Sequence, residues 1–228
     1  MAEAYMARNR GNGEIVFLKR VRRNSADKDA LEREMRIYER LMRMQTRHVL
    51  QVLDFIRDDE YVALVTQYAD GGDLNSYVER TGNNCGLPVG EAKEIAVSIA
   101  TALKELHDHD IVHRDLKPQN VVSHRNEWRL ADFGISKNLS RLVTQKTFQQ
   151  YGTRGYAAPE QFQGVEARPS ADIYSLGKIL VFLLTAQTDV DHVPFSAWRD
   201  LIRRCICHDS SQRPMTDKLI EELKSLPT

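Results

Sequence analysis

The hydrophobic pattern of the chain changes near residue 70, and this change limits the possible folds more than any other feature of the sequence. Before that point, apolar residues occur in short runs separated by polar or glycine-containing turns, the pattern of β-strands. The expected strands cover residues 2–8 and 14–21, joined as a hairpin by the turn 9–13, and residues 49–56 and 61–68. This part of the chain therefore predicts a small sheet.

Apolar residues after residue 70 recur every three or four positions, the period of an amphipathic helix. The expected helices cover residues 73–80, 89–107, 171–184, 196–207 and 215–225. One further amphipathic helix is predicted inside the strand-rich part, over residues 28–44. Strands followed by helices predict an α+β chain of two lobes, residues 1–69 and 70–228, with a cleft between them.

Composition and charge argue against several classes of protein. The 228 residues include 32 basic and 32 acidic side chains, so the zero net charge gives no long-range attraction to nucleic acid or to an anionic membrane. The longest apolar run, near residues 179–184, is shorter than the ~20 residues that a membrane-spanning helix needs. Three cysteines are too few for a disulfide framework, which is typical of a reducing compartment. We therefore expect a cytoplasmic protein with no membrane span and no nucleic-acid partner.

Two short groups of potential metal ligands occur in the helix-rich part. Cys205, Cys207 and His208 lie close together, as do His107 and His109. The cysteine group lacks a second ligand pair and lies in an expected helix. Of the histidines, which include His113 further along, His107 closes an expected helix and His113 belongs to the loop that follows. We therefore interpret the cysteines as core residues rather than as metal ligands.

Three motifs that carry chemistry follow one another along the helix-rich part. They are His113-Arg114-Asp115-Leu116-Lys117-Pro118-Gln119-Asn120, Asp132-Phe133-Gly134 and Ala158-Pro159-Glu160. In this order and spacing they resemble the catalytic-loop, metal-binding and activation-segment signatures of the protein kinase family. Lys117 and the pair Gly152-Thr153 resemble the Ser/Thr branch of that family. The resemblance extends over nearly the whole chain and implies the two-lobed protein kinase fold.

The resemblance assigns roles to four residues of the catalytic region. Phosphoryl transfer requires a hydroxyl aligned with the γ-phosphate of ATP, and neutralisation of the phosphate oxygens. Asp115 is expected to orient the substrate hydroxyl and accept its proton, and Lys117 to contact the transferring phosphate. Asn120 and Asp132 offer hard oxygen ligands, which suit Mg²⁺ or Mn²⁺. The implied substrates are ATP and the hydroxyl groups of a protein.

The resemblance implies that Lys19, at the end of a predicted strand, binds the phosphates of ATP. Lys19 ends the apolar run Ile15-Val16-Phe17-Leu18-Lys19, where a cation beside packed apolar residues needs compensation. The resemblance implies that Glu34, in the expected helix 28–44, is its partner. A movable helix that carries this carboxylate is the switch of the family.

The adenine site is expected where the two lobes join. The segment from Val65 to Asp73 resembles the kinase hinge, so Thr66 is expected to guard the back of the adenine pocket. Backbone groups of residues from Gln67 to Ala69 are expected to hydrogen-bond the base. Val122, which follows the catalytic loop, is also expected among the ATP-binding residues.

The polar stretch 135–157 resembles an activation segment. A phosphate on Thr144 or Thr147 would add about −1.5 to −2 charge, and it is expected to pair with Arg114 and order the stretch. Thr153 is expected to be structural and to face the substrate site. Glu160 and Arg213 resemble the ion pair that anchors the segment. Self-association for autophosphorylation is compatible with this scheme.

The sequence departs from the family at three places. Met1-Ala2-Glu3-Ala4-Tyr5 resembles the second half of the Gly-rich phosphate loop, so the N-lobe is expected to be truncated, without its first strand and most of that loop. Either this sequence starts after them, or the protein lacks them. Phe17 stands where the family has a small alanine packed against adenine. The stretch 185–194 is short for the segment between two helices of the C-lobe.

Three functions remain compatible with these residues. An active Ser/Thr protein kinase explains the complete set of charged and metal-ligating residues. A pseudokinase, acting as a nucleotide-binding or scaffold module, is favoured by the incomplete loop and by Phe17. A small-molecule phosphotransferase of the aminoglycoside-kinase type shares the catalytic-loop Asp and Asn, but it should lack Lys117-Pro118 and Ala158-Pro159-Glu160.

Overall fold

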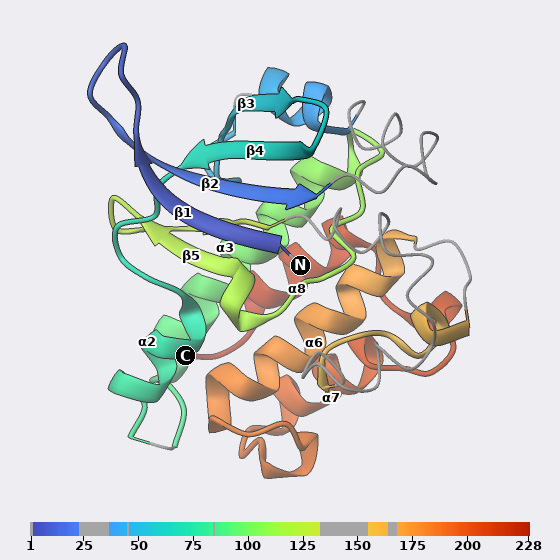
Figure 1. The fold of residues 1–228 in the computed structure, drawn as a ribbon. Coiled ribbons are helices and arrows are strands. Elements are labelled where there is room, and N and C mark those ends of the chain that lie inside the picture. Colours follow the sequence, from blue (N-terminus) through green and yellow to red (C-terminus); the bar gives the residue numbers. More distant parts are fainter. Residues whose placement is uncertain (1, 23–36, 45, 84, 133–154, 164–167) are drawn as a thin grey trace.

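A computed structural model describes residues 2–22, 37–44, 46–83, 85–132, 155–163 and 168–228. Its N-terminal sheet has four strands in the order β1-β2-β4-β3 (Figure 1). The strands are β1 (Ala2–Arg8), β2 (Ile15–Arg22), β3 (Val52–Arg57) and β4 (Tyr61–Gln67), and all pairs are antiparallel. The β1–β2 turn forms where the glycines predict it, because Gly13 has a φ of 77°, which other residues adopt only with strain.

Strand pairing determines which side chains share a face of this sheet. The β2–β4 pair places Phe17 opposite Thr66 and Lys19 opposite Leu64. Side chains alternate between the two faces along a strand. Phe17 and Lys19 therefore project from one face, and Arg20 projects from the other.

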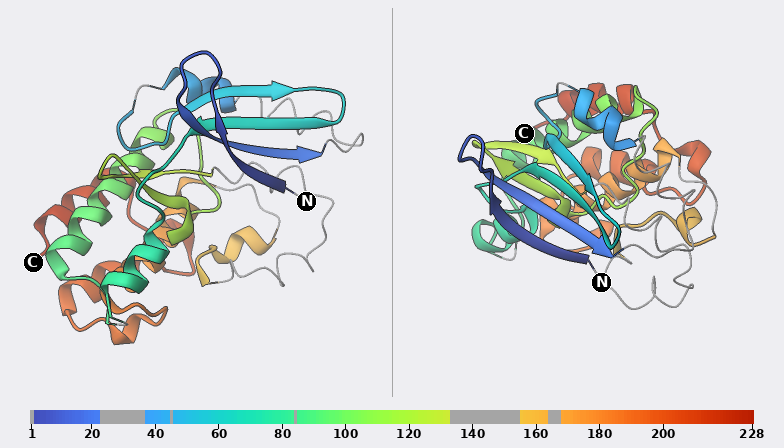
Figure 2. Two further views of the ribbon diagram at one scale, coloured as in Figure 1. Left: turned by 60° about the vertical axis from the view of Figure 1, so that its left-hand side comes forward. Right: turned by 45° about the horizontal axis from the view of Figure 1, so that its top comes forward.

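The helical part is built around α3 (Val89–His107) and α6 (Pro169–Thr185), which pack against each other (Figure 2). Most side chains of α6 are buried, because this helix is apolar on nearly all sides rather than amphipathic. The amphipathic α7 (Ser196–Cys205) packs on α6, and α8 (Thr216–Ser225) packs on α3. The short helix α2 (Leu74–Thr81) is capped by Asp73, whose side chain accepts a hydrogen bond from the Ser76 N–H.

A second sheet of two short strands follows the catalytic loop: β5 (Val121–His124) and β6 (Glu127–Leu130). At its turn Arg125 and Asn126 have φ values of 53° and 62°, as in a type I′ hairpin. Leu130 joins this hairpin to the segment before β3, because its carbonyl accepts from Leu50 N and its N–H donates to the His48 carbonyl, both at 2.8 Å. The hairpin therefore fixes the N-terminal sheet relative to the catalytic loop.

The structure confirms the expected α+β class and element order. Some boundaries were wrong. β3 begins at Val52 rather than at residue 49, because Val49 forms an isolated bridge with Leu130 instead. α7 ends at Cys205 rather than at residue 207. Residues 37–43 of the expected helix 28–44 are helical, and residues before 37 in that helix lie outside the described part.

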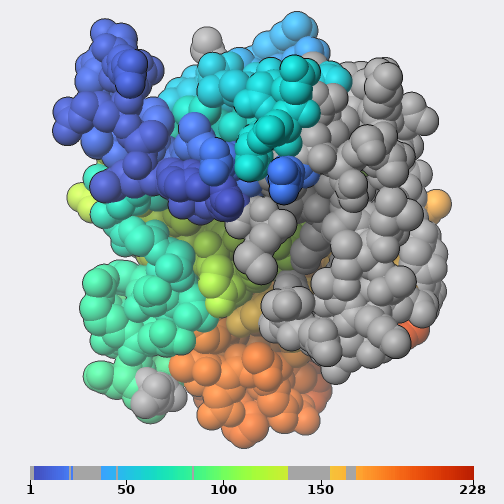
Figure 3. Space-filling model, in the orientation of Figure 1, coloured from blue at the N-terminus to red at the C-terminus, as the bar shows by residue number. Residues whose placement is uncertain are grey.

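In Figure 3 the residues of the N-terminal sheet, coloured blue to cyan, lie in the upper part of the view, and orange residues of the helical part lie at the bottom. Cys205 is fully buried in the helical core, and burial raises the pKa of its thiol to about 12, so it serves as a core residue. Within the described ranges, no helix combines the length and the apolar character needed to cross a membrane.

Candidate active site

Asp172, in the first turn of α6, binds the backbone of the catalytic loop. Its two carboxylate oxygens accept hydrogen bonds from the backbone N–H groups of His113 at 2.8 Å and Arg114 at 2.9 Å. Asp172 is only 1% exposed, so these bonds form in a largely dry environment. Arg114 has a φ of 69°, a strained conformation for a residue with a side chain. The carboxylate therefore stabilises a loop shape that the backbone alone disfavours.

His107, at the end of α3, extends this support. Its Nε2 lies 2.9 Å from Asp172 Oδ2, and its Nδ1 lies 2.9 Å from Thr216 Oγ1. Three helices, α3, α6 and α8, therefore meet beneath the catalytic loop through one buried side chain. Sequence reasoning did not find this role, although a histidine facing inward at a helix end was a signal for it. In the part of the chain that the structure describes, no three His, Cys, Asp or Glu side chains form a metal-ligand group.

Asp115 lies within the loop with two polar side chains against it. Asn120 Nδ2 donates to the Asp115 carbonyl at 2.7 Å and approaches its Oδ2 at 3.4 Å. Lys117 Nζ lies 3.3 Å from the same Oδ2. Asp115 is 8% exposed, so its carboxylate is held by its neighbours rather than by water. The structure thus brings together the three residues that the sequence predicted for the catalytic loop.

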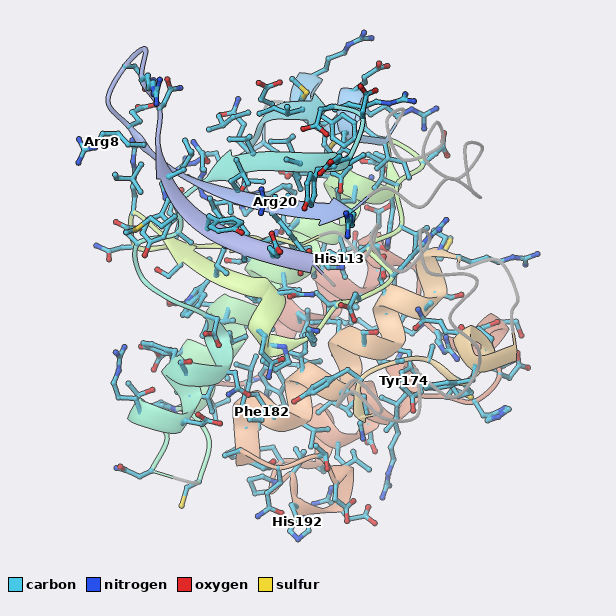
Figure 4. The ribbon with its side chains drawn as sticks, viewed as in Figure 1. Arg8, Arg20, His113, Tyr174, Phe182 and His192 are labelled. Carbon is cyan, nitrogen blue, oxygen red and sulfur yellow. The ribbon has the colours of Figure 1, made fainter. Side chains whose placement is uncertain are left out.

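His113 connects this loop to the residue before Asp132. Its Nε2 donates to the Ala131 carbonyl at 3.1 Å, and its Nδ1 accepts from the Asp115 N–H at 3.4 Å. The Ala131 N–H in turn donates to the Asn120 carbonyl at 2.8 Å. Both ends of the catalytic loop are therefore tied to the backbone that carries Asp132. Figure 4 shows His113 between the N-terminal sheet and the helices.

Lys19 reaches from β2 to Asp132. The distance between Lys19 Nζ and Asp132 Oδ1 is 2.5 Å, and both side chains are partly exposed, 20% for the lysine and 39% for the aspartate. Glu34, the partner expected from the sequence, lies outside the described residues. Asp132 has a φ of 52°, so its backbone is held in the left-handed region at this contact.

The predicted adenine-site residues line the junction of β4 with the helical part. Thr66 is 8% exposed, and its hydroxyl donates to the Gln67 carbonyl at 3.0 Å. Ala69 is half-buried in the connection to α2. Val122 forms an isolated antiparallel bridge with Asp73, which brings β5 against that connection.

An ion pair anchors the motif Ala158-Pro159-Glu160. Arg213 Nη1 lies 2.6 Å and Nη2 2.9 Å from the two carboxylate oxygens of Glu160. The Arg213 side chain is fully buried and also donates to the carbonyls of Ser170 and Cys207, each at 2.9 Å. Burial alone would raise the pKa of Glu160, but the hydrogen bonds and the positive charge of Arg213, together with a backbone hydrogen bond, outweigh burial and leave this pKa below its usual range.

Gln161 links the same motif to the catalytic loop. Its Oε1 accepts from the Ala158 N–H, and its Nε2 donates to the Arg114 carbonyl, both at 2.9 Å. The sequence gave no sign of this role, because a polar residue after Ala158-Pro159-Glu160 has no pattern of its own. The expected phosphorylation sites Thr144 and Thr147, and also Thr153, lie outside the described residues.

Comparison with known proteins agrees with this geometry. The sequence model of the protein kinase domain matches residues 1–193. A probable Ser/Thr protein kinase PknB from Lactococcus lactis is 34% identical over 194 residues, covering 84% of this chain and 30% of that protein. The Ser/Thr protein kinase ULK3 of Xenopus laevis is 31% identical over 229 residues, covering 99% of this chain and 47% of that protein. The chain belongs to the protein kinase family, and its branch is that of the Ser/Thr kinases.

A third relative is the Ser/Thr protein kinase ATG1c of Arabidopsis thaliana, 34% identical over 186 residues that cover 80% of this chain and 25% of that protein. The chain thus spans from a quarter to about half the length of these three relatives. The similarity extends across both the N-terminal sheet and the catalytic loop.

Proposed function

We propose that this chain is the catalytic part of a Ser/Thr protein kinase, which transfers the γ-phosphate of ATP to hydroxyl groups of a protein. The observation that carries the proposal is the contact of Lys19 with Asp132 beside a loop in which Lys117 and Asn120 both contact Asp115. Kinase chemistry needs these charges at one point, because catalysis there is mainly positioning and charge neutralisation.

In this proposal the residues of the catalytic loop divide the transfer step between them. Asp115 accepts a hydrogen bond from the serine or threonine hydroxyl and takes its proton as the oxygen attacks the γ-phosphorus. The new P–O bond forms as the bond to the bridging oxygen of ADP breaks, and ADP leaves with that electron pair. Lys117, whose ammonium already lies 3.3 Å from the Asp115 carboxylate, neutralises the transferring phosphate.

Asn120 and Asp132 fit a divalent cation of the Mg²⁺ class. Asn120 uses its Nδ2 on the Asp115 backbone, which leaves its amide oxygen for a ligand. With the Asp132 carboxylate this gives the hard oxygen donors that Mg²⁺ and Mn²⁺ prefer. A bound cation would neutralise charge on the nucleotide phosphates. Lys19 would bind the phosphates, and Glu34 would hold Lys19 in place.

The nucleotide base would lie near the connection from β4 to α2. In this proposal Thr66 borders the back of the base site, residues from Gln67 to Ala69 supply backbone hydrogen bonds, and Val122 contributes apolar contact. The buried position of Thr66 supports the first of these roles.

Regulation would act through the segment before Ala158. We propose that phosphate on Thr144 or Thr147 pairs with Arg114, that Thr153 faces the substrate site, and that association of two copies permits autophosphorylation. The Glu160–Arg213 ion pair would anchor the end of this segment. The cysteine content favours a cytoplasmic location.

Phe17 supports one second candidate, a pseudokinase that binds nucleotide or a partner but transfers little phosphate. A phenyl ring on the face that carries Lys19 narrows the space for a base. Incubation with labelled ATP, Mg²⁺ and a general protein substrate decides between the two. Transfer by the wild type that is lost in Asp115→Asn and Asp132→Asn supports the kinase. Magnesium-dependent ATP binding without transfer supports the pseudokinase.

A further inference from the structure

The connection between β4 and α2, residues 68–73, lies along β5. The Gly71 N–H donates to the Ser123 carbonyl at 3.0 Å, and the Ser123 N–H donates to the Gly72 carbonyl at 2.8 Å. The approach is so close that a Cβ on Gly71 would lie 2.5 Å from Ser123 Oγ. Glycine is therefore required at residue 71, and the path of this connection is fixed by the strand beneath it.

His124, the last residue of β5, adds a side-chain contact to the same connection. Its Nδ1 lies 2.9 Å from the Tyr68 carbonyl oxygen and 3.7 Å from Asp70 Oδ1. Both neighbours can only accept, so Nδ1 carries the proton. His124 is 8% exposed, and its Nε2 is buried with no hydrogen-bond partner among the described residues. Burying an imidazole nitrogen without a hydrogen-bond partner costs stability, so packing alone does not explain a histidine at this position. The contact with the Tyr68 carbonyl therefore needs an explanation of its own.

The reason lies in the geometry of the peptide that follows. All peptide bonds of the described residues are trans, and in a trans peptide the C=O and N–H point in opposite directions. Since His124 holds the Tyr68 carbonyl, the Ala69 N–H must point away from His124. No hydrogen bond of the Ala69 N–H to another described residue is present. The Ala69 N–H is thus a donor that points away from the His124 ring and has no partner among the described residues.

We propose that His124 is a positioning residue that aims the Ala69 N–H at a ring-nitrogen acceptor of the nucleotide base, the N1 atom of adenine. The inference rests on the proposed binding of ATP and adds a residue that sets the choice of base. Guanine carries a hydrogen on the equivalent nitrogen, so two donors would face each other, and a base without this acceptor leaves the donor unpaired.

The test compares ATP with 1-deazaadenosine triphosphate, which lacks only the ring nitrogen in question. Binding of each to the whole chain is titrated with Mg²⁺ for the wild type, His124→Leu and His124→Asn. An asparagine amide can donate from the position of the imidazole Nδ1, so it serves as the rescue. His192→Leu, the same change at the far end of the helical part (Figure 4), is the matched control. Magnesium tripolyphosphate reports the phosphate site without a base.

We expect the wild type to prefer ATP by roughly three- to tenfold, as for one hydrogen bond. His124→Leu should lose this preference while tripolyphosphate binding is unchanged, and His124→Asn and His192→Leu should keep it. The inference is overturned if the wild type shows no preference, or if His124→Leu weakens both nucleotides equally or neither. Absence of any magnesium-dependent ATP binding by the wild type would instead refute the proposed function.

Discussion

Lys19 Nζ lies 2.5 Å from Asp132 Oδ1, so the cation expected to bind phosphate and a carboxylate expected to bind metal are paired with each other. Both charged side chains are partly exposed, so the free-energy cost of removing them from water is small. A bound nucleotide with its metal would have to break the Lys19–Asp132 ion pair or contact both side chains. The pair therefore joins the N-terminal sheet to the catalytic region, and under the proposed function a bound nucleotide would take over this contact.

Lys19→Met is expected to lower phosphotransfer by at least about a hundredfold, because it removes a charge that acts on the phosphates. The folded state should lose less than about 1 kcal/mol, as for other exposed ion pairs. Initial rates with labelled ATP and urea denaturation measure the two effects.

Arg20→Met is the matched control for Lys19→Met. Arg20 is adjacent in sequence but projects from the opposite face, where it pairs with Glu3 at 2.5 Å and covers the Tyr61 ring. It should leave the transfer rate unchanged. Equal losses of rate in the two variants would contradict a specific role for Lys19.

Asp172→Ala is expected to destabilise the fold by about 3–5 kcal/mol, because it strands two buried N–H groups of the catalytic loop and the His107 imidazole. Urea denaturation measures this loss as a lower midpoint concentration, provided that the dependence of the unfolding free energy on urea is the same for both proteins. Asp200→Ala, on the exposed face of α7, should change stability by less than about 0.5 kcal/mol. A midpoint for Asp172→Ala close to that of Asp200→Ala would show that the loop does not depend on the carboxylate.

The sequence could predict which catalytic residues lie together when they are close to one another along the chain. Asp115, Lys117 and Asn120 lie within six positions of one another, so their convergence follows from one short loop. The helices α2 and α3 were predicted almost to the residue, because their apolar period is regular.

Of the contacts between distant segments, the Glu160–Arg213 ion pair was predicted through the family resemblance, but others could not be predicted. The joining of His107, Asp172 and Thr216 depends on how three helices cross. The hairpin β5–β6 was missed because two strands of four residues carry too little pattern to distinguish them from loop. His124 acquires its partner only through that hairpin.

Glu160→Gln is expected to cost about 1–3 kcal/mol at pH 7, since it leaves the buried Arg213 guanidinium without a carboxylate. The pKa of Glu160 in the folded protein is below its unfolded value of about 4.3. Its contribution is therefore complete above that value and is lost as the pH falls through the folded pKa. Urea denaturation between pH 7 and 3 should show the two proteins converge in acid. A constant difference at all pH values would exclude this ion pair as the cause.

Phe17 provides the last prediction, because strand pairing sets it opposite Thr66 on the face that carries Lys19. Its ring is half-buried and, among the described residues, is not part of the hydrophobic core, which agrees with a position on the face where the base is expected. Phe17→Ala should open that space and raise the affinity for Mg²⁺-ATP by about tenfold, whereas Phe195→Ala, at an exposed ring before α7, should not change it. Nucleotide titration of both variants measures this. If Phe17→Ala instead weakens binding, the ring stacks on the base, as aromatic side chains do with single nucleotides, and does not crowd it.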